Sequence, residues 1–171
     1  MNGRIAALIG ILIGVAAVTF TMGRKPMPRF VWNASASVPI GLYSVSPVDN
    51  LTVGNLVIVT PPPLLASFLV ERGYLPLGVP LIKRILALPG QSVCRREFTI
   101  SVDGIEIGTA LAYDHRGRPL PAWQGCRAIA QGEVFLMNSD APASFDGRYF
   151  GPTPLAAIVG RAEPLWTFKA Q

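Results

Sequence analysis

A run of apolar residues near the amino terminus, Ile5–Met22, constrains the fold of this chain more than any other feature of its sequence. Its 18 residues carry no charge. As an α-helix they would extend about 27 Å, close to the hydrocarbon core of a bilayer at about 30 Å. A cleaved signal peptide is the alternative, although its apolar region is usually shorter. We therefore expect residues 1–26 to form an N-terminal membrane anchor, or else a signal segment, and residues 27–171 to form a separate domain.

The charges on either side of this run bear on its orientation in a membrane. Arg4 precedes the run, whereas Arg24, Lys25 and Arg29 follow it. Because positive residues collect on the cytoplasmic side, this distribution favours a cytoplasmic carboxyl-terminal domain. The composition, with 50% hydrophobic and 15% charged residues, is typical of a membrane-associated protein.

The composition argues against a nucleic-acid partner and against a bound metal or cofactor. The net charge is +5, but the basic residues form only pairs such as Arg95–Arg96 and no basic face interleaved with aromatics. We therefore expect no nucleic-acid partner. One histidine and two cysteines do not readily supply the ligands of a metal site, so we expect neither a metal nor another cofactor.

Beyond Pro28 the pattern predicts a mainly β domain on a single N-terminal transmembrane helix. The apolar and β-branched runs predict strands, and Asp103-Gly104 between alternating apolar residues predicts a hairpin turn. A proline-led apolar segment that ends at Gly73 predicts a short helix. The polar, proline-bearing segment Thr109–Gln124 is expected to be an excursion. The expected strands are residues 53–60, 79–88, 132–138 and 157–168, the hairpin is residues 98–108, and the helix is residues 61–74.

The stretch "NASASVPIGLY", Asn33–Tyr43, permits two interpretations. Ala34-Ser35-Ala36 has the form of a signal-peptidase cleavage site, which would make this chain a substrate. Such sites follow closely behind the apolar region, however, and here a stretch with three basic residues intervenes. The other interpretation makes Ser37 a nucleophile that cleaves other chains.

Lysine is scarce, and its placement suggests a general base. Of the three lysines, Lys25 flanks the apolar run and Lys169 lies in the carboxyl-terminal tail, so only Lys83 lies in the middle of the domain. On a strand its face carries Leu81 and Ile85, and burial among such groups lowers the pKa of a lysine from its usual value of about 10.4. A neutral amine can take a proton from a serine hydroxyl. The alternative is a lysine at the edge of the interior whose amine reaches water.

The single histidine and the two cysteines do not require a catalytic role. His115, in "YDHRGRP", is expected to be an ordinary surface residue rather than the base of a Ser-His-Asp triad. Cys94 and Cys126 lack the spacing of a CxxC motif. Outside the cytoplasm they would form a disulfide, and inside it they would be buried thiols.

Three segments, taken in order, resemble the serine/lysine signal peptidases (S26). They are "SVPIGLY" (Ser37–Tyr43), "PLIKRILALPGQ" (Pro80–Gln91) and "FDGRYFG" (Phe145–Gly151). The S-x-P-x-G-L-Y form is closer to the conjugative-transfer, TraF-type branch than to the housekeeping branch. The resemblance covers most of residues 30–166, and it implies a signal-peptidase-like β domain.

This resemblance assigns roles to individual residues. Ser37 matches the nucleophile and Lys83 the general base, while Asp146 matches an aspartate that helps to order the site. Ser35 matches the residue whose hydroxyl joins the Ser37 backbone N–H in the oxyanion hole. A structural ion pair between Asp146 and Arg148 is an equal alternative. Gly147 stands where the family usually has serine, which leaves open whether a serine hydroxyl orients the lysine.

The resemblance also implies a place and a substrate. It predicts a bacterial inner-membrane protein with a periplasmic catalytic domain, residues 27–171, in which Cys94 and Cys126 form a disulfide. The expected substrate is a prepilin or another exported precursor, and other conjugative-transfer proteins are expected partners. TraF-type enzymes process a pilin, and some close it into a ring.

Three alternatives remain beside pilin maturation. The first is a housekeeping-like signal peptidase that cleaves exported preproteins. The second is a non-catalytic envelope scaffold of a conjugation or type IV secretion apparatus. The third is a membrane adaptor that faces the cytoplasm, as the flanking charges suggest.

Overall fold

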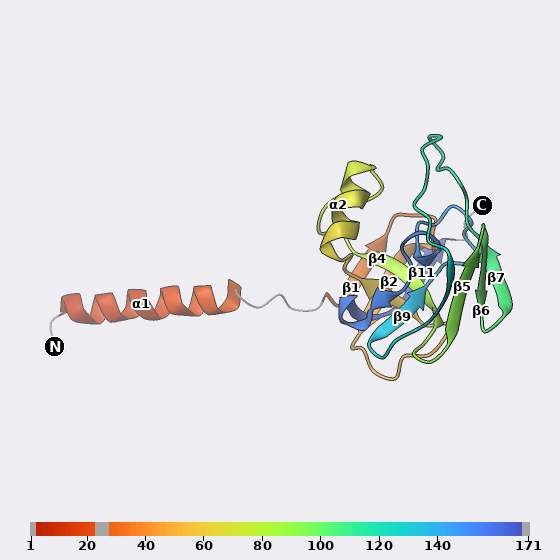
Figure 1. Cartoon of the computed structure of the whole chain (residues 1–171). Coiled ribbons are helices and arrows are strands. Elements are labelled where there is room, and N and C mark those ends of the chain that lie inside the picture. The colour runs from red at the N-terminus through yellow and green to blue at the C-terminus, as the bar shows by residue number, and fades with distance from the viewer. Residues whose placement is uncertain (1–2, 23–27, 169–171) are drawn as a thin grey trace.

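The computed structural model describes residues 3–22 and 28–168 (Figure 1). Helix α1, Gly3–Met22, is apolar along its whole length, and Arg4 is its one charged residue. By length and composition α1 is able to cross a membrane, as predicted. The expected boundary at residues 26 and 27 lies outside the described residues.

The β domain is built around a seven-stranded antiparallel sheet in the order β1-β2-β11-β3-β4-β9-β10. Strand β11 is long enough to pair with β2 along one part and with β3 along another. It therefore joins the end of the chain to strands from the first third of the domain. The strands are β1 (Phe30–Asn33), β2 (Ile40–Ser46), β3 (Leu56–Val59), β4 (Leu81–Ala87), β9 (Glu133–Leu136), β10 (Thr153–Pro154) and β11 (Ile158–Phe168).

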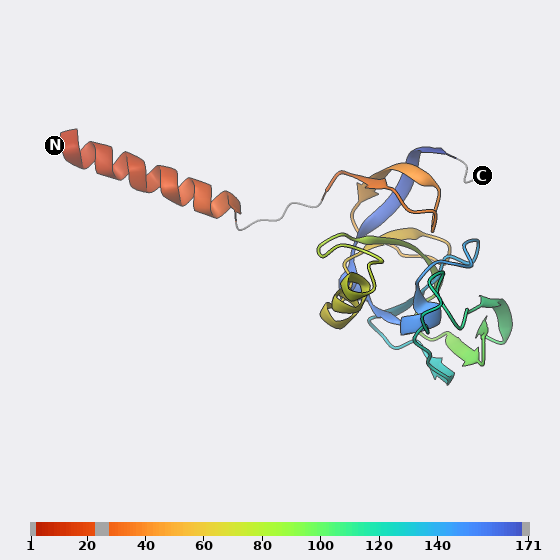
Figure 2. The ribbon, with the colours of Figure 1, turned by 90° about the horizontal axis from the view of Figure 1, so that it is seen from above.

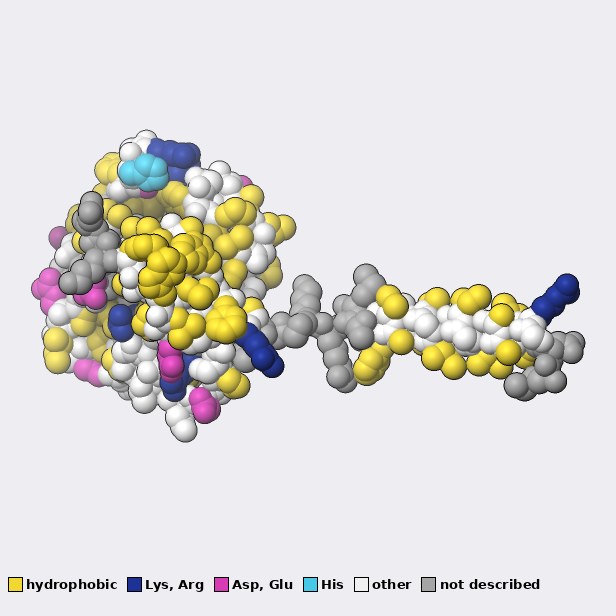
Figure 3. Space-filling model, turned by 180° about the vertical axis from the view of Figure 1, so that it is seen from behind, with side chains coloured by type: hydrophobic (Ala, Val, Ile, Leu, Met, Phe, Trp, Pro, Cys, Tyr) yellow, Lys and Arg dark blue, Asp and Glu magenta, His cyan; other side chains and the backbone are white. Residues whose placement is uncertain are grey.

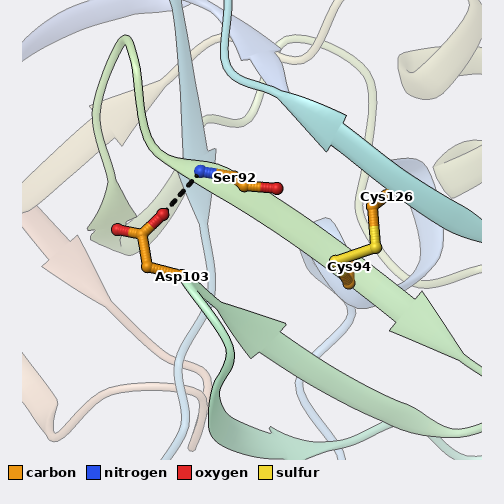
Figure 4. The surroundings of a disulfide bond; sticks show 4 residues. All are labelled: Ser92, Cys94, Asp103 and Cys126. Carbon is orange, nitrogen blue, oxygen red and sulfur yellow. Dashed lines mark hydrogen bonds between the residues drawn. A yellow bond between two sulfur atoms is a disulfide. The ribbon is translucent and has the colours of Figure 1, made fainter.

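A second antiparallel sheet has the order β7-β6-β5-β8 and lies at the side of the domain away from β1 (Figure 1). Cys94 and Cys126 occupy paired positions on β5 and β8, and they form a disulfide (Figure 4). The Asp103 carboxylate accepts a 2.8 Å hydrogen bond from the Ser92 backbone N–H (Figure 4). The four strands are β5 (Ser92–Arg96), β6 (Thr99–Val102), β7 (Ile105–Thr109) and β8 (Gly125–Ala128).

The core follows from the alternation of side chains along the strands. On β3, Leu56 and Ile58 pack into one buried cluster, whereas Val57 and Val59 pack into another on the opposite face. A third cluster packs Val93 and other residues of the smaller sheet against Phe135 and Met137. This third cluster thus joins the two sheets.

Two connections leave the sheets and rise from the same end of the domain (Figure 1). The first, residues 60–80, contains helix α2 (Pro63–Glu71) and is called the α2 excursion. Proline occupies the first turn of α2, and Gly73 follows its end with φ +65°, a conformation that favours glycine. The second, residues 110–124, contains no strand apart from one isolated bridge, and it is called the 110–124 excursion.

The predicted elements are confirmed, with shorter bounds for most of the strands and for the helix. The hairpin turn is at Asp103-Gly104 as predicted, with φ values of 49° and 82°. The sequence pattern did not predict β1, β2, β5 or β8, nor the short elements α3 (Gly147–Phe150), β10 and η1 (Leu155–Ala157). Strand β8 is exposed at all four positions, so it carries no apolar alternation to detect.

Candidate active site

Ser37 lies in the turn that joins β1 to β2, and a buried asparagine orders this turn. The side-chain amide of Asn33 donates to the carbonyls of Ser35 (2.7 Å), Val38 (3.0 Å) and Pro39 (3.1 Å). Its oxygen accepts from the Ser35 backbone N–H at 3.2 Å. Asn33 thereby fixes the backbone on both sides of Ser37. The sequence analysis missed Asn33, whose place at a strand end before a serine-rich turn was the available signal.

The hydroxyls of Ser35 and Ser37 lie side by side. Their Oγ atoms are 2.9 Å apart, within hydrogen-bond distance. The Ser35 hydroxyl also donates to Asn33 Oδ1 at 3.3 Å. The structure therefore places the predicted oxyanion-hole hydroxyl in contact with the predicted nucleophile.

Lys83 is buried on β4, with 3% of its surface exposed. This excludes the alternative of a lysine whose amine reaches water. Burial lowers the pKa of Lys83 from 10.5 to about 8, an effect that the Asp146 carboxylate opposes and the Arg148 guanidinium reinforces. A large fraction of the Lys83 amine is therefore neutral slightly above physiological pH.

The hydrogen-bond partner of Lys83 is Ser144, a residue that the sequence analysis did not single out. Lys83 Nζ donates to Ser144 Oγ at 2.7 Å, and both groups are buried. A serine hydroxyl thus orients the lysine even though glycine occupies position 147. A Cβ at Gly147 would lie 2.6 Å from the Leu136 carbonyl oxygen and 2.7 Å from Phe135 Cε2, so the packing has no room for a serine there.

Asp146 and Arg148 form a fully buried ion pair. Arg148 Nη2 lies 2.9 Å from Asp146 Oδ2, and the two side chains are 1% and 0% exposed. Arg148 also donates to the carbonyls of Ala141 (2.8 Å) and Ser144 (3.1 Å). Among the described residues, the Asp146 carboxylate accepts hydrogen bonds from Arg148 and from the Asn138 backbone N–H, and none from Lys83. Asp146 thus forms an ion pair with the arginine that contacts the Ser144 backbone, as the structural ion-pair alternative expects.

A cleft of about 640 Å³ brings these groups together. Ser35, Ser37, Lys83 and Ser144 all line it, although they come from three separate segments of the chain. No direct hydrogen bond joins Ser37 to Lys83 in the part of the chain that the structure describes: the one contacts Ser35 and the other Ser144. Within the same part of the chain, no group of three or more His, Cys, Asp or Glu side chains could hold a metal ion.

His115 is exposed, as predicted for a surface residue, but it also lines this cleft. It belongs to the 110–124 excursion, which forms one side of the cleft together with the α2 excursion. Figure 3 shows a hollow at this end of the molecule, beside the single histidine in cyan. The sequence analysis thus predicted correctly that His115 is exposed, but it did not predict that His115 lines the cleft.

A buried lysine held by a serine, in the same cleft as a serine on an ordered turn, is an arrangement suited to peptide-bond cleavage without histidine. Residues 3–166 match the family model described as signal peptidase, peptidase S26. The chain belongs to this family.

Several of the proteins that the chain resembles are conjugal or plasmid transfer proteins. The chain is 34% identical to a probable conjugal transfer protein TraF of Sinorhizobium fredii, over 92% of this chain and 90% of that one. It is 38% identical to the conjugal transfer protein TraF of Agrobacterium fabrum, with coverage of 80% and 81%. A plasmid transfer protein TraF of Escherichia coli is 33% identical, with coverage of 96% and 97%. A solved signal peptidase I of Enterococcus faecalis has a TM-score of 0.40 and 17% identity, over 67% of this chain and 97% of that one.

Proposed function

We propose that this protein is a membrane-anchored serine endopeptidase in which Ser37 is the nucleophile and Lys83 the general base. The observation that carries the proposal is the buried Lys83 amine, with its pKa lowered to about 8, in the cleft that Ser37 also lines. Neighbouring Arg84 could not take this role, because a guanidinium keeps its proton in proteins. Membership of the peptidase S26 family supports the same assignment.

In the proposed mechanism, neutral Lys83 takes the proton of the Ser37 hydroxyl as its oxygen attacks the carbonyl carbon of the scissile bond. The Ser37 backbone N–H and the Ser35 hydroxyl stabilise the resulting oxyanion. One donor of this kind is typically worth about 10²–10³ in rate. Protonated Lys83 then gives its proton to the leaving amine, and an ester on Ser37 remains. Ser144 keeps the amine aimed into the cleft throughout.

We propose a prepilin as the substrate, cleaved after small residues on the periplasmic side of the inner membrane. The TraF names of the relatives support a role in conjugation, and α1 provides the anchor. Cleavage of other exported precursors, as by a housekeeping signal peptidase, is the alternative substrate class. Other conjugative-transfer proteins would be its partners at the membrane.

The ester on Ser37 has two possible fates. Water hydrolyses it to a linear pilin, or the pilin's own amino terminus attacks it and closes a ring. Ring closure needs no external energy, because the ester retains the energy of the cleaved bond. It requires only that the amine be held close while water is partly excluded.

The first experiment compares the full chain with Ser37→Ala, Lys83→Met and Lys83→Arg on a co-expressed candidate prepilin. All three variants should lose cleavage, while their thermal unfolding stays cooperative. The cleavage rate of the unaltered protein should rise with pH through about 8, since Lys83 acts in its neutral form. Near-normal turnover by Lys83→Arg would remove Lys83 from the mechanism. Conjugation that survives Ser37→Ala would favour a non-catalytic scaffold.

A second measurement separates the two fates of the ester. A cyclic pilin is lighter than the linear cleaved product by one water, and it has no free amino end for Edman degradation. A mature product with the linear mass and a readable amino terminus would identify a simple processing peptidase.

A further inference from the structure

The α2 excursion and the 110–124 excursion are joined by a compact polar cluster at one side of the cleft. Asp114 accepts from the Tyr74 hydroxyl at 2.6 Å and from Arg118 Nε at 2.8 Å. Arg118 also donates to the Arg72 carbonyl at 3.0 Å, and its guanidinium stands over the Tyr74 ring. These contacts connect segments about 40 positions apart, so neither excursion is an independent loop.

This cluster keeps its charges at all ordinary pH values. Burial acts to raise the pKa of Asp114, but the hydrogen bonds from Tyr74, Arg118 and the backbone outweigh it and hold that pKa well below its usual range. The cluster is therefore a permanent connection rather than a pH-dependent one.

Phe145 attaches the α2 excursion to the segment that carries Ser144. Its ring stacks on Phe68 with centroids 5.4 Å apart and on Tyr149 at 5.1 Å, and it contacts Tyr74 at 5.4 Å. The excursions are thus fixed relative to the Lys83–Ser144 pair. We call these two excursions together the outer wall of the cleft.

The surface that the outer wall turns toward the cleft is rich in leucine. Leu69 and Leu75 come from the α2 excursion, and Leu111 and Leu120 come from the other. Leu69 is buried, Leu75 and Leu120 are half-buried, and Leu111 is exposed. Asp114, His115 and Arg116 also line the cleft, but His115 and Arg116 are exposed.

An open apolar cavity beside a nucleophile is suited to a substrate side chain, because binding there removes apolar surface from water. Small residues next to the scissile bond need little space, and this cleft of about 640 Å³ is far larger. We propose that the outer wall forms a separate subsite for a large apolar side chain of the substrate, and that the Tyr74–Asp114–Arg118 cluster holds this subsite in shape. The proposal rests on the peptidase function proposed above and specifies its substrate class.

The test measures binding, so that it does not depend on cleavage. The full chain with Ser37→Ala is placed in lipid nanodiscs, and fluorescein-labelled twelve-residue peptides with an Ala-Ser-Ala core are titrated by anisotropy. In one set a single leucine occupies each flanking position in turn, and the reference peptide has serine there. At one position or more, leucine should improve affinity about tenfold, the value expected for burying its side chain.

Variants assign this selectivity to the outer wall. Leu111→Ser with Leu120→Ser should reduce the leucine preference to about twofold or less. Ile105→Ser is the matched control, because Ile105 is an exposed apolar residue on β7, 70% exposed, that does not line the cleft. It should leave the preference unchanged. Tyr74→Phe keeps the ring but removes the hydroxyl, and it should weaken leucine peptides severalfold without affecting the serine peptide.

Two results would overturn the proposal. One is equal affinity for all peptides, and the other is a leucine preference that survives the double variant. A loss of thermal stability in Tyr74→Phe without any change in selectivity would make the cluster purely structural. If the leucine preference holds while no peptide is cleaved by the Ser37 form, the peptidase function fails and the subsite remains, so the two outcomes are distinguishable.

Discussion

Because of Lys83, the stability of the folded state depends on pH in the alkaline range. Its pKa is about 8 in the folded protein and about 10.5 when the chain is unfolded. Below pH 8 the amine is charged in both states, so the folded protein bears the full cost of burying it. Between pH 8 and 10.5 the unfolded chain binds more protons, and stability therefore rises with pH across this window.

The size of this effect can be measured by difference. A shift of the pKa from 10.5 to about 8 corresponds to about 3 kcal/mol. Urea unfolding of the full chain in detergent, followed by tryptophan fluorescence, should show the unaltered protein gaining about that much relative to Lys83→Met between pH 8 and 10.5. If the free energy of unfolding changed with pH in the same way for both proteins, Lys83 would have an ordinary pKa.

At position 147 this chain has glycine where the family usually has serine. The packing around Gly147 predicts that a serine there would destabilise the domain. The added Cβ would press on the Leu136 carbonyl and the Phe135 ring, which are buried and have little freedom to move. Gly147→Ser should destabilise the domain by about 1–3 kcal/mol. Gly147→Ala should cost a similar amount, because the Cβ and not the hydroxyl causes the overlap. Thermal unfolding measures both, and a stable Gly147→Ser variant would contradict the argument.

At the scale of elements, the turn between β1 and β2 depends on Asn33. Its amide group faces three backbone carbonyls, so Asn33→Asp would place a carboxylate oxygen against acceptors without changing the shape of the side chain. The loss of a buried donor costs about 1–3 kcal/mol. Because the turn carries Ser37, kcat should fall more than KM changes. Steady-state kinetics with a cleavable peptide tests this, and a change confined to KM would show that the turn keeps its shape without Asn33.

Elements with a local sequence pattern could be predicted, whereas contacts between distant segments could not. The strand carrying Lys83 and the hairpin at Asp103 were predictable, because their patterns are local. Lys83 itself stood out because it is the one lysine in the middle of the domain's sequence. Ser144 was not predictable from spacing, since its contact with Lys83 joins segments 61 positions apart. The cleft-lining position of His115 likewise depends on how two long excursions pack together, which no local pattern encodes.

At the scale of the whole molecule, strand β11 and the disulfide connect parts of the chain that are far apart in the sequence. Figure 2, seen from above, shows β11 running across the domain toward the carboxyl terminus. The smaller sheet is closed by the Cys94–Cys126 bridge, which joins β5 to β8 directly after the 110–124 excursion. The bridge thus anchors one end of the outer wall.

Loss of this bridge should affect stability more than chemistry. Closing a loop with a separation of 32 residues is worth about 3–4 kcal/mol in the chain-entropy account. Cys94→Ala with Cys126→Ala should therefore lower the melting temperature, while peptide cleavage at low temperature stays close to that of the unaltered protein. Differential scanning fluorimetry and a cleavage assay on the same preparation separate the two effects. Complete loss of cleavage at a temperature where the variant is folded would tie the bridge to the active site.

The bridge also provides a test of the orientation of the molecule in the membrane. The charges of Arg24, Lys25 and Arg29 favour a cytoplasmic domain, whereas a stable disulfide requires an oxidising compartment such as the periplasm. In cells treated with a thiol-alkylating reagent before lysis, the full chain should show no modified cysteine after denaturation. The same chain expressed without residues 1–22 should stay in the reducing cytoplasm and show two modified cysteines. Two reactive thiols in the full chain would place the domain in the cytoplasm, as the flanking charges predict, and would rule out a periplasmic substrate.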